Sequence, residues 1–316
     1  MTIDGETFHA GERELQTLAG SADRLAQAGP RVVRDHMPLQ HRDFFAQLPF
    51  LVAGGVDDAG QPRVGVLTGP PGFVRSPDER LLRVEATLPP HDPLAPLITD
   101  GAPIGLLGIE PHTRRRNRLN GWVTQLREDG FSVAVGQSFG NCPKYIQARQ
   151  PRFDPEAPSP QAPERGAGLD AEARATIAKA DTFFIATAHP QARGSHERSH
   201  GVDVSHRGGP TGFVGVQGDQ LTVPDFVGNG FFNTIGNLVL EPRCSLLFLD
   251  FDRGDATWVT ARSELSWDPD QAARAFPGTL RLLHLQAESF LRVRRALPLR
   301  WGGAEPAPEL ARLGRW

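Results

Sequence analysis

The chain has 316 residues, of which 39% are hydrophobic and 22% charged, and its net charge is −3. It is long enough for two globular domains, and its slight negative charge argues against a nucleic-acid scaffold, which needs clustered positive charge. Cys142 and Cys244 are too few for a disulfide framework, and the chain has no long apolar run and no signal-peptide pattern, so we expect a cytoplasmic protein without a membrane span.

Three residue types are unusually rare. All six asparagines fall within 114–121, 138–147 and 228–237, only two lysines accompany 32 arginines, and Tyr145 is the single tyrosine. These residues persist where an amide, an amine or a phenol is needed, so the three segments are candidate sites. Four of the asparagines border glycine, which is typical of turns, and the sequence leaves both interpretations open.

The predicted elements begin with a helix over 11–27, within an N-terminal helical segment. A first set of strands follows at 50–53, 63–67, 81–84, 104–109 and 122–123, with a helix over 92–99. After a Pro/Glu-rich connector, Asp170 is placed to cap a helix that runs to Ala180. A second set of strands lies at 183–186, 202–205, 220–223, 244–249 and 258–259, with a helix over 229–240.

The two sets repeat at an offset of about 140 residues, too long a period for a solenoid. The segment 69–74 (GPPGFV) matches 209–214 (GPTGFV), and the Leu-Leu pairs at 106 and 246, the W-V-T motifs at 122 and 258, and Asp43 and Asp181 with the phenylalanine pairs that follow them align in order. Several short strands per copy predict a small closed barrel. The expected organisation is a helical segment (1–36), a first barrel (37–150), a connector (151–168), a second barrel (169–301) and a tail (302–316).

Several motifs carry a resemblance. The second copy contains S-H-R-G-G at 205–209, P-D-F at 224–226 and N-T-I-G-N-L at 233–238, and G-N-C-P-K-Y-I at 140–146 precedes it. In this order they resemble the pyridoxamine 5′-phosphate oxidase-like family of FMN-binding split barrels. The resemblance implies a mainly β (α+β) chain of two tandem split β-barrels that form an internal pseudo-dimer, with flanking helices.

The resemblance also implies where FMN would bind. Strand 204–207 would run beside the isoalloxazine ring and the ribityl chain, and Arg207, Asn233 and Thr234 would contact the phosphate. A dianion suits a helix N-terminus and a guanidinium that clamps two oxygens, although a capped helix with a glycine turn is the plainer alternative. The cofactor-binding candidates of the second copy are Val204, Ser205, His206, Arg207, Asp225, Asn229, Asn233, Thr234 and Asn237.

The first copy departs from the motif. It has G-V-L-T at 65–68 and no phosphate donors at 93–97, so we expect one flavin per chain and a degenerate groove in the first barrel. Arg116 and Arg118, from the basic run 114–118, are expected to face the flavin from the opposite side. For each of these arginines the alternative is a solvated hairpin loop.

Cys142, Lys144 and Tyr145 are the candidates for proton or nucleophile chemistry, because these rare residues cluster. The alternative is that Lys144 or Tyr145 binds an anionic group or caps the pocket. His196 and His200 have metal-ligand spacing only on a helix, which the neighbouring glycines and serines disfavour, so no metal site is expected.

The expected function is that of an FMN-dependent oxidoreductase, which transfers hydride or electrons at flavin N5 to or from a small molecule. NAD(P)H or O2 is the expected redox partner, and pairing of chains into a homodimer is left open. The tandem arrangement and altered motifs argue against pyridoxamine phosphate oxidation itself. The alternatives are a non-catalytic flavin-binding or sensing module and a relative that binds heme or the deazaflavin F420.

Overall fold

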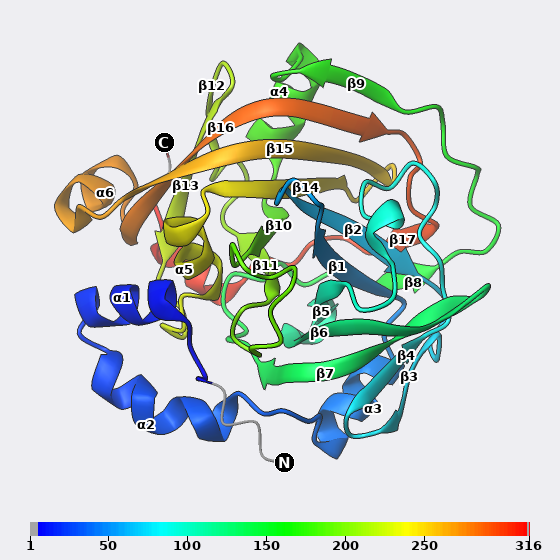
Figure 1. Ribbon diagram of the computed structural model, residues 1–316. Helices are drawn as coiled ribbons and strands as arrows, with labels where there is room; N and C mark the ends of the chain where they lie inside the picture. Colours follow the sequence, from blue (N-terminus) through cyan, green and yellow to red (C-terminus); the bar gives the residue numbers. More distant parts are fainter. Residues whose placement is uncertain (1–5, 315) are drawn as a thin grey trace.

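A seven-stranded and an eight-stranded antiparallel sheet dominate the computed structural model, which describes residues 6–314 and 316 (Figure 1). The first sheet has the order β2-β1-β5-β6-β7-β4-β3, and the second has β11-β10-β14-β15-β16-β13-β12, with β9 added beside β16. The strands are β1 (Phe50–Val56), β2 (Pro62–Thr68), β3 (Val74–Asp78), β4 (Leu81–Val84), β5 (Pro103–Glu110), β6 (Arg115–Arg127), β7 (Gly130–Gly140), β10 (Thr182–Ala188), β11 (Val202–Gly208), β12 (Gly215–Gln217), β13 (Gln220–Phe226), β14 (Arg243–Asp250), β15 (Asp255–Ser266) and β16 (Thr279–Val293).

The two sheets correspond strand for strand, as a duplicated barrel requires. The matched segments 69–74 and 209–214 both begin the connection from the second to the third strand of their sheet. One part of the expected alignment is wrong. Asp43 and its phenylalanine pair lie on helix α3 (Leu39–Ala46), whereas Asp181 directly precedes β10, so α3 corresponds in order to α4 (Ala171–Lys179).

Strand β1 is buried on both faces. Leu51 and Ala53 pack in the core of the first barrel, while Phe50 and Val52 belong to a separate apolar layer between the barrels. Because side chains alternate along a strand, a continuous apolar run serves two cores at once. We call this layer the seam; its members include Phe50, Val52, Val64, Val66, Leu107, Ile109, Phe184, Ala186, Val204, Leu247 and Trp258.

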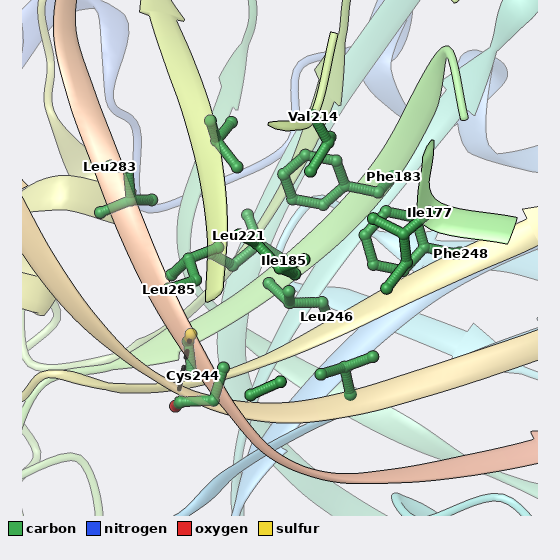
Figure 2. Packing of buried hydrophobic residues seen from close by; sticks show 14 of the residues in the cluster. Ile177, Phe183, Ile185, Val214, Leu221, Cys244, Leu246, Phe248, Leu283 and Leu285 are labelled. Carbon is green, nitrogen blue, oxygen red and sulfur yellow. Dashed lines mark hydrogen bonds between the residues drawn. The ribbon is translucent and has the colours of Figure 1, made fainter. Parts of the chain in front are cut away.

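Strand β10 repeats the pattern in the second barrel. Phe183 and Ile185 point into the core shown in Figure 2, whereas Phe184 and Ala186 join the seam. Cys244 lies in the same core, where its Sγ donates to the Ala261 carbonyl at 3.6 Å (Figure 2). Burial raises the pKa of this thiol to about 12, so Cys244 is a packing residue.

The helices match the predictions in part. Asp170 caps α4 as expected, since its Oδ1 accepts the Ala173 N–H at 2.7 Å. The helix expected over 11–27 is two helices, α1 (Ala10–Leu18) and α2 (Ala22–Val32), because the chain turns at Gly20 with φ +64°. No helix longer than one 3₁₀ turn, η1 (Ala95–Leu97), forms within 92–99.

The helix expected over 229–240 starts later. It is α5 (Asn233–Leu240), because Phe232 before it adopts φ 64°, outside the helical region. The remaining helical elements are α6 (Pro269–Ala275), η2 (Pro111–Thr113) and η3 (Pro308–Arg312). Within the described residues, none of the helices has the length and apolar character needed to span a bilayer.

Several segments are more ordered than predicted. The strands that hold Trp122 and Trp258, β6 and β15, are not the last strands of their sheets in chain order, because β7 and β16 follow them. The basic run 114–118 is not a hairpin loop, since residues 115–118 open strand β6. The connector is not wholly irregular, because β8 (Pro151–Phe153) pairs with β17 (Leu299–Trp301), and β9 (Glu164–Ala167) extends the second sheet.

The barrels approach each other closely where β5 meets β11. A Cβ atom on Gly105 would lie 2.2 Å from the carbonyl oxygen of Val202. Because that atom belongs to the backbone of a buried strand, it cannot give way as a side chain would. The close packing of β5 against β11 therefore requires glycine at position 105.

We predict that Gly105→Ala lowers the free energy of unfolding by about 1–3 kcal/mol, the usual cost of overpacking. Urea unfolding at constant m-value measures it. Gly303→Ala is the control, because a Cβ there meets nothing within 4 Å, and its effect should stay within about 0.5 kcal/mol. Equal effects in the two variants would contradict this role of Gly105.

Candidate functional site

A cleft of about 280 Å³ lies at the edge of the seam, and both barrels line it. We call it the seam cleft. The second barrel contributes β11, β13, the start of α5 and the start of β16. The first barrel contributes Leu107 of β5, Arg116 and Arg118 of β6, and the segment 141–142 that follows β7. The turn between α1 and α2 adds Ala19, Ser21 and Arg24, which sequence reasoning missed because nothing in that turn signals a contact with distant strands.

Strand β11 forms one wall of the cleft. Ser205, His206 and Arg207 line it, whereas Val204 packs in the seam. The Ser205 hydroxyl oxygen accepts a hydrogen bond from Thr234 Oγ1 at 2.7 Å, which fixes the start of α5 against the strand. The structure therefore brings Arg207 and Thr234 to the same cleft.

A shared carboxylate holds one corner of the cleft. Asp225 Oδ1 accepts Arg207 Nη1 at 2.5 Å, and Asp225 Oδ2 accepts Arg281 Nε at 2.8 Å. Arg281, which the sequence did not single out, also stacks over the rings of Phe232 and Trp267 at 4.9 and 4.6 Å. Two guanidinium groups against one carboxylate leave this corner positive.

Arg116 reaches the cleft from the opposite barrel. Its Nε donates to the Cys142 carbonyl at 2.7 Å and its Nη1 to the His206 carbonyl at 3.2 Å. No carboxylate within the described part of the chain forms an ion pair with it. Burial, with Arg118 and Arg207 nearby, lowers the pKa of Arg116 to about 10, so it remains a cation without a countercharge at neutral pH.

His206 lies between the barrels and is only 5% exposed. Its Nδ1 lies 3.4 Å from Arg116 Nη1, and its ring meets the Phe184 ring edge-on. Burial and the neighbouring arginines hold the pKa of His206 well below its usual value, so the imidazole is neutral.

Asp203, on β11 beside this wall, joins the barrels through a buried polar network. Asp203 Oδ1 accepts Arg118 Nη1 and Asn120 Nδ2, each at 2.8 Å, and Oδ2 accepts Asn237 Nδ2 at 3.1 Å. Arg118 also donates to the hydroxyl of Ser205. Asn237 was expected to bind cofactor, but its amide faces Asp203 and it does not line the cleft.

The other two asparagines of the segment have different surroundings. Asn229 Oδ1 accepts the Phe231 N–H at 3.1 Å within the loop before α5, so Asn229 is not on the helix that carries Asn233 and Asn237. Asn233 Nδ2 donates to Glu12 of α1, a carboxyl whose pKa is raised well above its usual range by burial and by Asp203. Both asparagines line the cleft.

Two buried polar atoms at the cleft have no partner within the described residues, Arg118 Nε and Asn141 Oδ1. Together with the unpaired Arg116, they leave donor and acceptor capacity for a bound group. A polar, anionic ligand fits these requirements, whereas an apolar one would leave them unmet.

The catalytic candidates lie together on the segment after β7. Cys142 lines the seam cleft, and Lys144 and Tyr145 line a side cavity next to it. His196 and His200 lie in the loop before β11, where His200 stacks on His189 with 3.9 Å between ring centroids. Within the described residues, no cluster of His, Cys, Asp and Glu is arranged to hold a metal ion.

Structural comparison matches proteins that cover about two fifths of this chain and most of their own length. A protein of the pyridoxinephosphate oxidase family from Clostridium acetobutylicum matches at 11% identity over 44% of this chain and 94% of its own (TM-score 0.28). An FMN-binding protein from Syntrophomonas wolfei (15%, 38% and 82%, 0.27) and a heme storage protein from Vibrio cholerae (14%, 40% and 95%, 0.27) also match. No family model and no curated protein matches the chain.

Each unit of this chain is a split barrel. A cavity of about 510 Å³, lined by residues of both split barrels, is the counterpart of the seam cleft. The strand register shows which residues are equivalent in the two sites. Trp258 is equivalent to Arg118, Arg63 is equivalent to Asp203, and Thr260 is equivalent to Asn120. Arg63 donates to Thr260 Oγ1 at 3.2 Å and pairs with Asp57, so its charge is neutralised.

In this counterpart groove, a carboxyl group lies at the place where the seam cleft has the residues expected to contact the phosphate. Asp92 accepts the N–H groups of Leu94 at 2.9 Å and Val66 at 3.2 Å. A Cβ at Gly65 would lie 2.4 Å from Asp92 Oδ1, so the carboxyl fills the space beside β2. Burial raises the pKa of Asp92 to about 7.

We predict that Asp92→Asn changes how stability depends on pH. The folded pKa of about 7 exceeds the unfolded value of about 3.9, so the folded state binds the extra proton between them. The contribution of Asp92 to stability is therefore complete below about pH 4 and declines as the pH rises through 7. Urea unfolding between about pH 4 and pH 8 should show the wild type losing stability relative to the variant. Asp58→Asn, at an exposed carboxylate, is the control, and curves that stay parallel for Asp92→Asn would refute the assignment.

Proposed function

We propose that the seam cleft binds one FMN per chain and that the protein is an FMN-dependent oxidoreductase acting on a small molecule. The observation that carries the proposal is Arg116, a partly buried guanidinium that borders the cleft and has no carboxylate partner in the described chain. A charge held away from bulk water without a countercharge is costly, and a phosphate dianion would supply the missing countercharge. Arg207 and the start of α5 border the same cleft.

The division of labour among these residues follows from their contacts. Arg116, Arg207 and Thr234 would hold the phosphate, with Asp225 fixing the direction of the Arg207 fork. The helix N-terminus adds unpaired backbone N–H groups and a positive dipole end. Arg118 Nε and Asn141 Oδ1 are the donor and the acceptor left for polar atoms elsewhere on the cofactor.

FMN supplies hydride or electron transfer at its ring nitrogen N5. The chain would position the cofactor and set its surroundings. The apolar seam excludes water from one side of the cleft, and His206, which borders the cleft, is neutral. NAD(P)H or O2 would serve as the redox partner, and Cys142 is the thiol placed at the cleft. A non-catalytic flavin-binding module would share all of these contacts and differ only in turnover.

Heme is the competing ligand, because His206 offers a neutral imidazole. The guanidinium of Arg116 lies near Nδ1 and the ring meets Phe184, so binding of a heme iron by Nδ1 would require these groups to move. The observed packing favours the flavin.

We expect ligand release by denaturation, followed by mass spectrometry, to give FMN at about one per chain, since in the counterpart groove Asp57 pairs with Arg63 and the Asp92 carboxyl fills the space beside β2. The oxidised protein should show flavin absorbance bands, and bleaching by NAD(P)H with recovery in air would separate an enzyme from a binding module. A Soret band, or two flavins per chain, would overturn the proposal.

Arg116→Ala should weaken FMN binding by about 10- to 100-fold, the value of a charge-assisted hydrogen bond, and should reduce its dependence on salt. Fluorescence titration of the apoprotein with FMN measures both. Arg115→Ala is the matched control, because Arg115 is the next residue on β6 and its guanidinium lies over Phe44, 5.1 Å from the ring centroid. If both variants bind FMN as the wild type does, Arg116 does not hold the phosphate.

A further inference from the structure

A side cavity of about 80 Å³ opens beside the seam cleft. Arg116, Cys142, His206 and Arg207 border both spaces, so a molecule in one borders a molecule in the other. The cavity has its own wall, formed by Lys144 and Tyr145 on one side and the Gly208 and Pro224 regions on the other. We call it the side lobe.

The wall that carries Lys144 is held firmly. Tyr145 has φ +65°, and its hydroxyl donates to the Val227 carbonyl at 3.2 Å. Its own carbonyl lies against Gly208, where a Cβ would be 2.1 Å away. Gln147 Nε2 donates to the Gly209 carbonyl at 2.8 Å. This segment of the first barrel is therefore fastened to the second, and Lys144 has a defined position.

The side lobe is positively charged. Lys144, Arg116 and Arg207 border it, and no carboxylate does so among the described residues. Asp225 binds Arg207 from the seam cleft, but neither Lys144 nor Arg116 has an ion-pair partner in the described chain. A half-buried amine and a half-buried guanidinium around a small cavity are suited to an anion.

The cavity size limits the anion. About 80 Å³ accommodates a group of a few heavy atoms, such as a carboxylate or phosphate, but not a ring system. Thr234 and Asn233 border the seam cleft and not the side lobe. The phosphate of the cofactor and the anion of the lobe would therefore occupy different places.

We propose that the side lobe binds an oxyanion group of the substrate, carboxylate or phosphate, with Lys144 as its counter-charge. The proposal rests on the proposed function, because it takes the seam cleft as the cofactor site. The expected substrate therefore has an anionic end that binds in the side lobe, and the rest of the substrate would extend toward the seam cleft. Lys144 is then a specificity residue, while Tyr145 positions it.

The single tyrosine allows a selective test. Holoprotein labelled with 3-fluorotyrosine carries one fluorine site, at Tyr145, beside the side lobe. Titration with inorganic phosphate and, separately, with acetate at constant ionic strength should give a saturating ¹⁹F shift. The stronger of the two responses identifies the class of oxyanion.

Three variants test whether Lys144 is responsible for the ¹⁹F response. Lys144→Ala should weaken anion binding by about tenfold or more, and Lys144→Arg should retain most of it, because a cation remains. Lys179→Ala removes the other lysine, which is exposed near the end of α4, and should titrate as the wild type does. Flavin content, read by absorbance after gel filtration, should be the same in all of them.

Three results would overturn the inference: no saturating shift in the wild type, an unchanged titration in Lys144→Ala, or loss of flavin from Lys144→Ala. The last would mean that the lobe holds the cofactor phosphate. The proposed function fails separately, by absence of flavin from the wild-type protein, because flavin content and the ¹⁹F titration are independent measurements.

Discussion

The ion pair between Asp203 and Arg118 determines how the two barrels meet at their polar edge. Asp203 accepts from two residues of β6 and from α5, and both charged side chains are almost completely buried. Removing one partner of such a pair typically costs about 3–5 kcal/mol, because the other remains as an uncompensated charge. The pair fixes the position of β6 along the length of β11. Since side chains on one face of a strand recur at every second residue, it also places Arg116 at the cleft.

The apolar seam and the polar cleft are two parts of one interface. Strands β1 and β10 give one face to their own barrel and the other to the seam, so neither barrel can shift without exposing apolar surface. The close approach at Gly105 removes the remaining freedom. A site built across this interface inherits its rigidity, and preorganised charges bind a ligand without the cost of ordering them.

The sequence predicted the elements whose signal is local. The apolar runs of β1, β10, β5 and β14, the Asp170 cap and the duplicated order all follow from short-range patterns. Strands β7 and β16 were missed because polar residues interrupt their apolar pattern, and the break at Gly20 depends on a left-handed backbone.

The site was predicted only in part, for a physical reason. Each asparagine cluster belongs to a segment with residues that border the seam cleft, but Asn237 and Asn120 bind Asp203, a partner that only the packing of two barrels supplies. The contact of Asn233 with Glu12 joins residues 221 apart in the chain, and the α1–α2 turn borders a cleft whose other lining residues lie at 107–281. No local pattern carries such information.

Fusion of the two barrels has a consequence for how this protein can change. In an assembly of two identical subunits, every substitution appears at both symmetry-related places, so improving one binding surface alters the other. Here the positions of Arg118 and Trp258 are equivalent by register but encoded separately. One of them could therefore become an indole, whose Nε1 donates to the Val64 carbonyl at 2.8 Å, while the other kept its charge. Duplication within one chain thus frees one half to specialise in structure and the other in recognition.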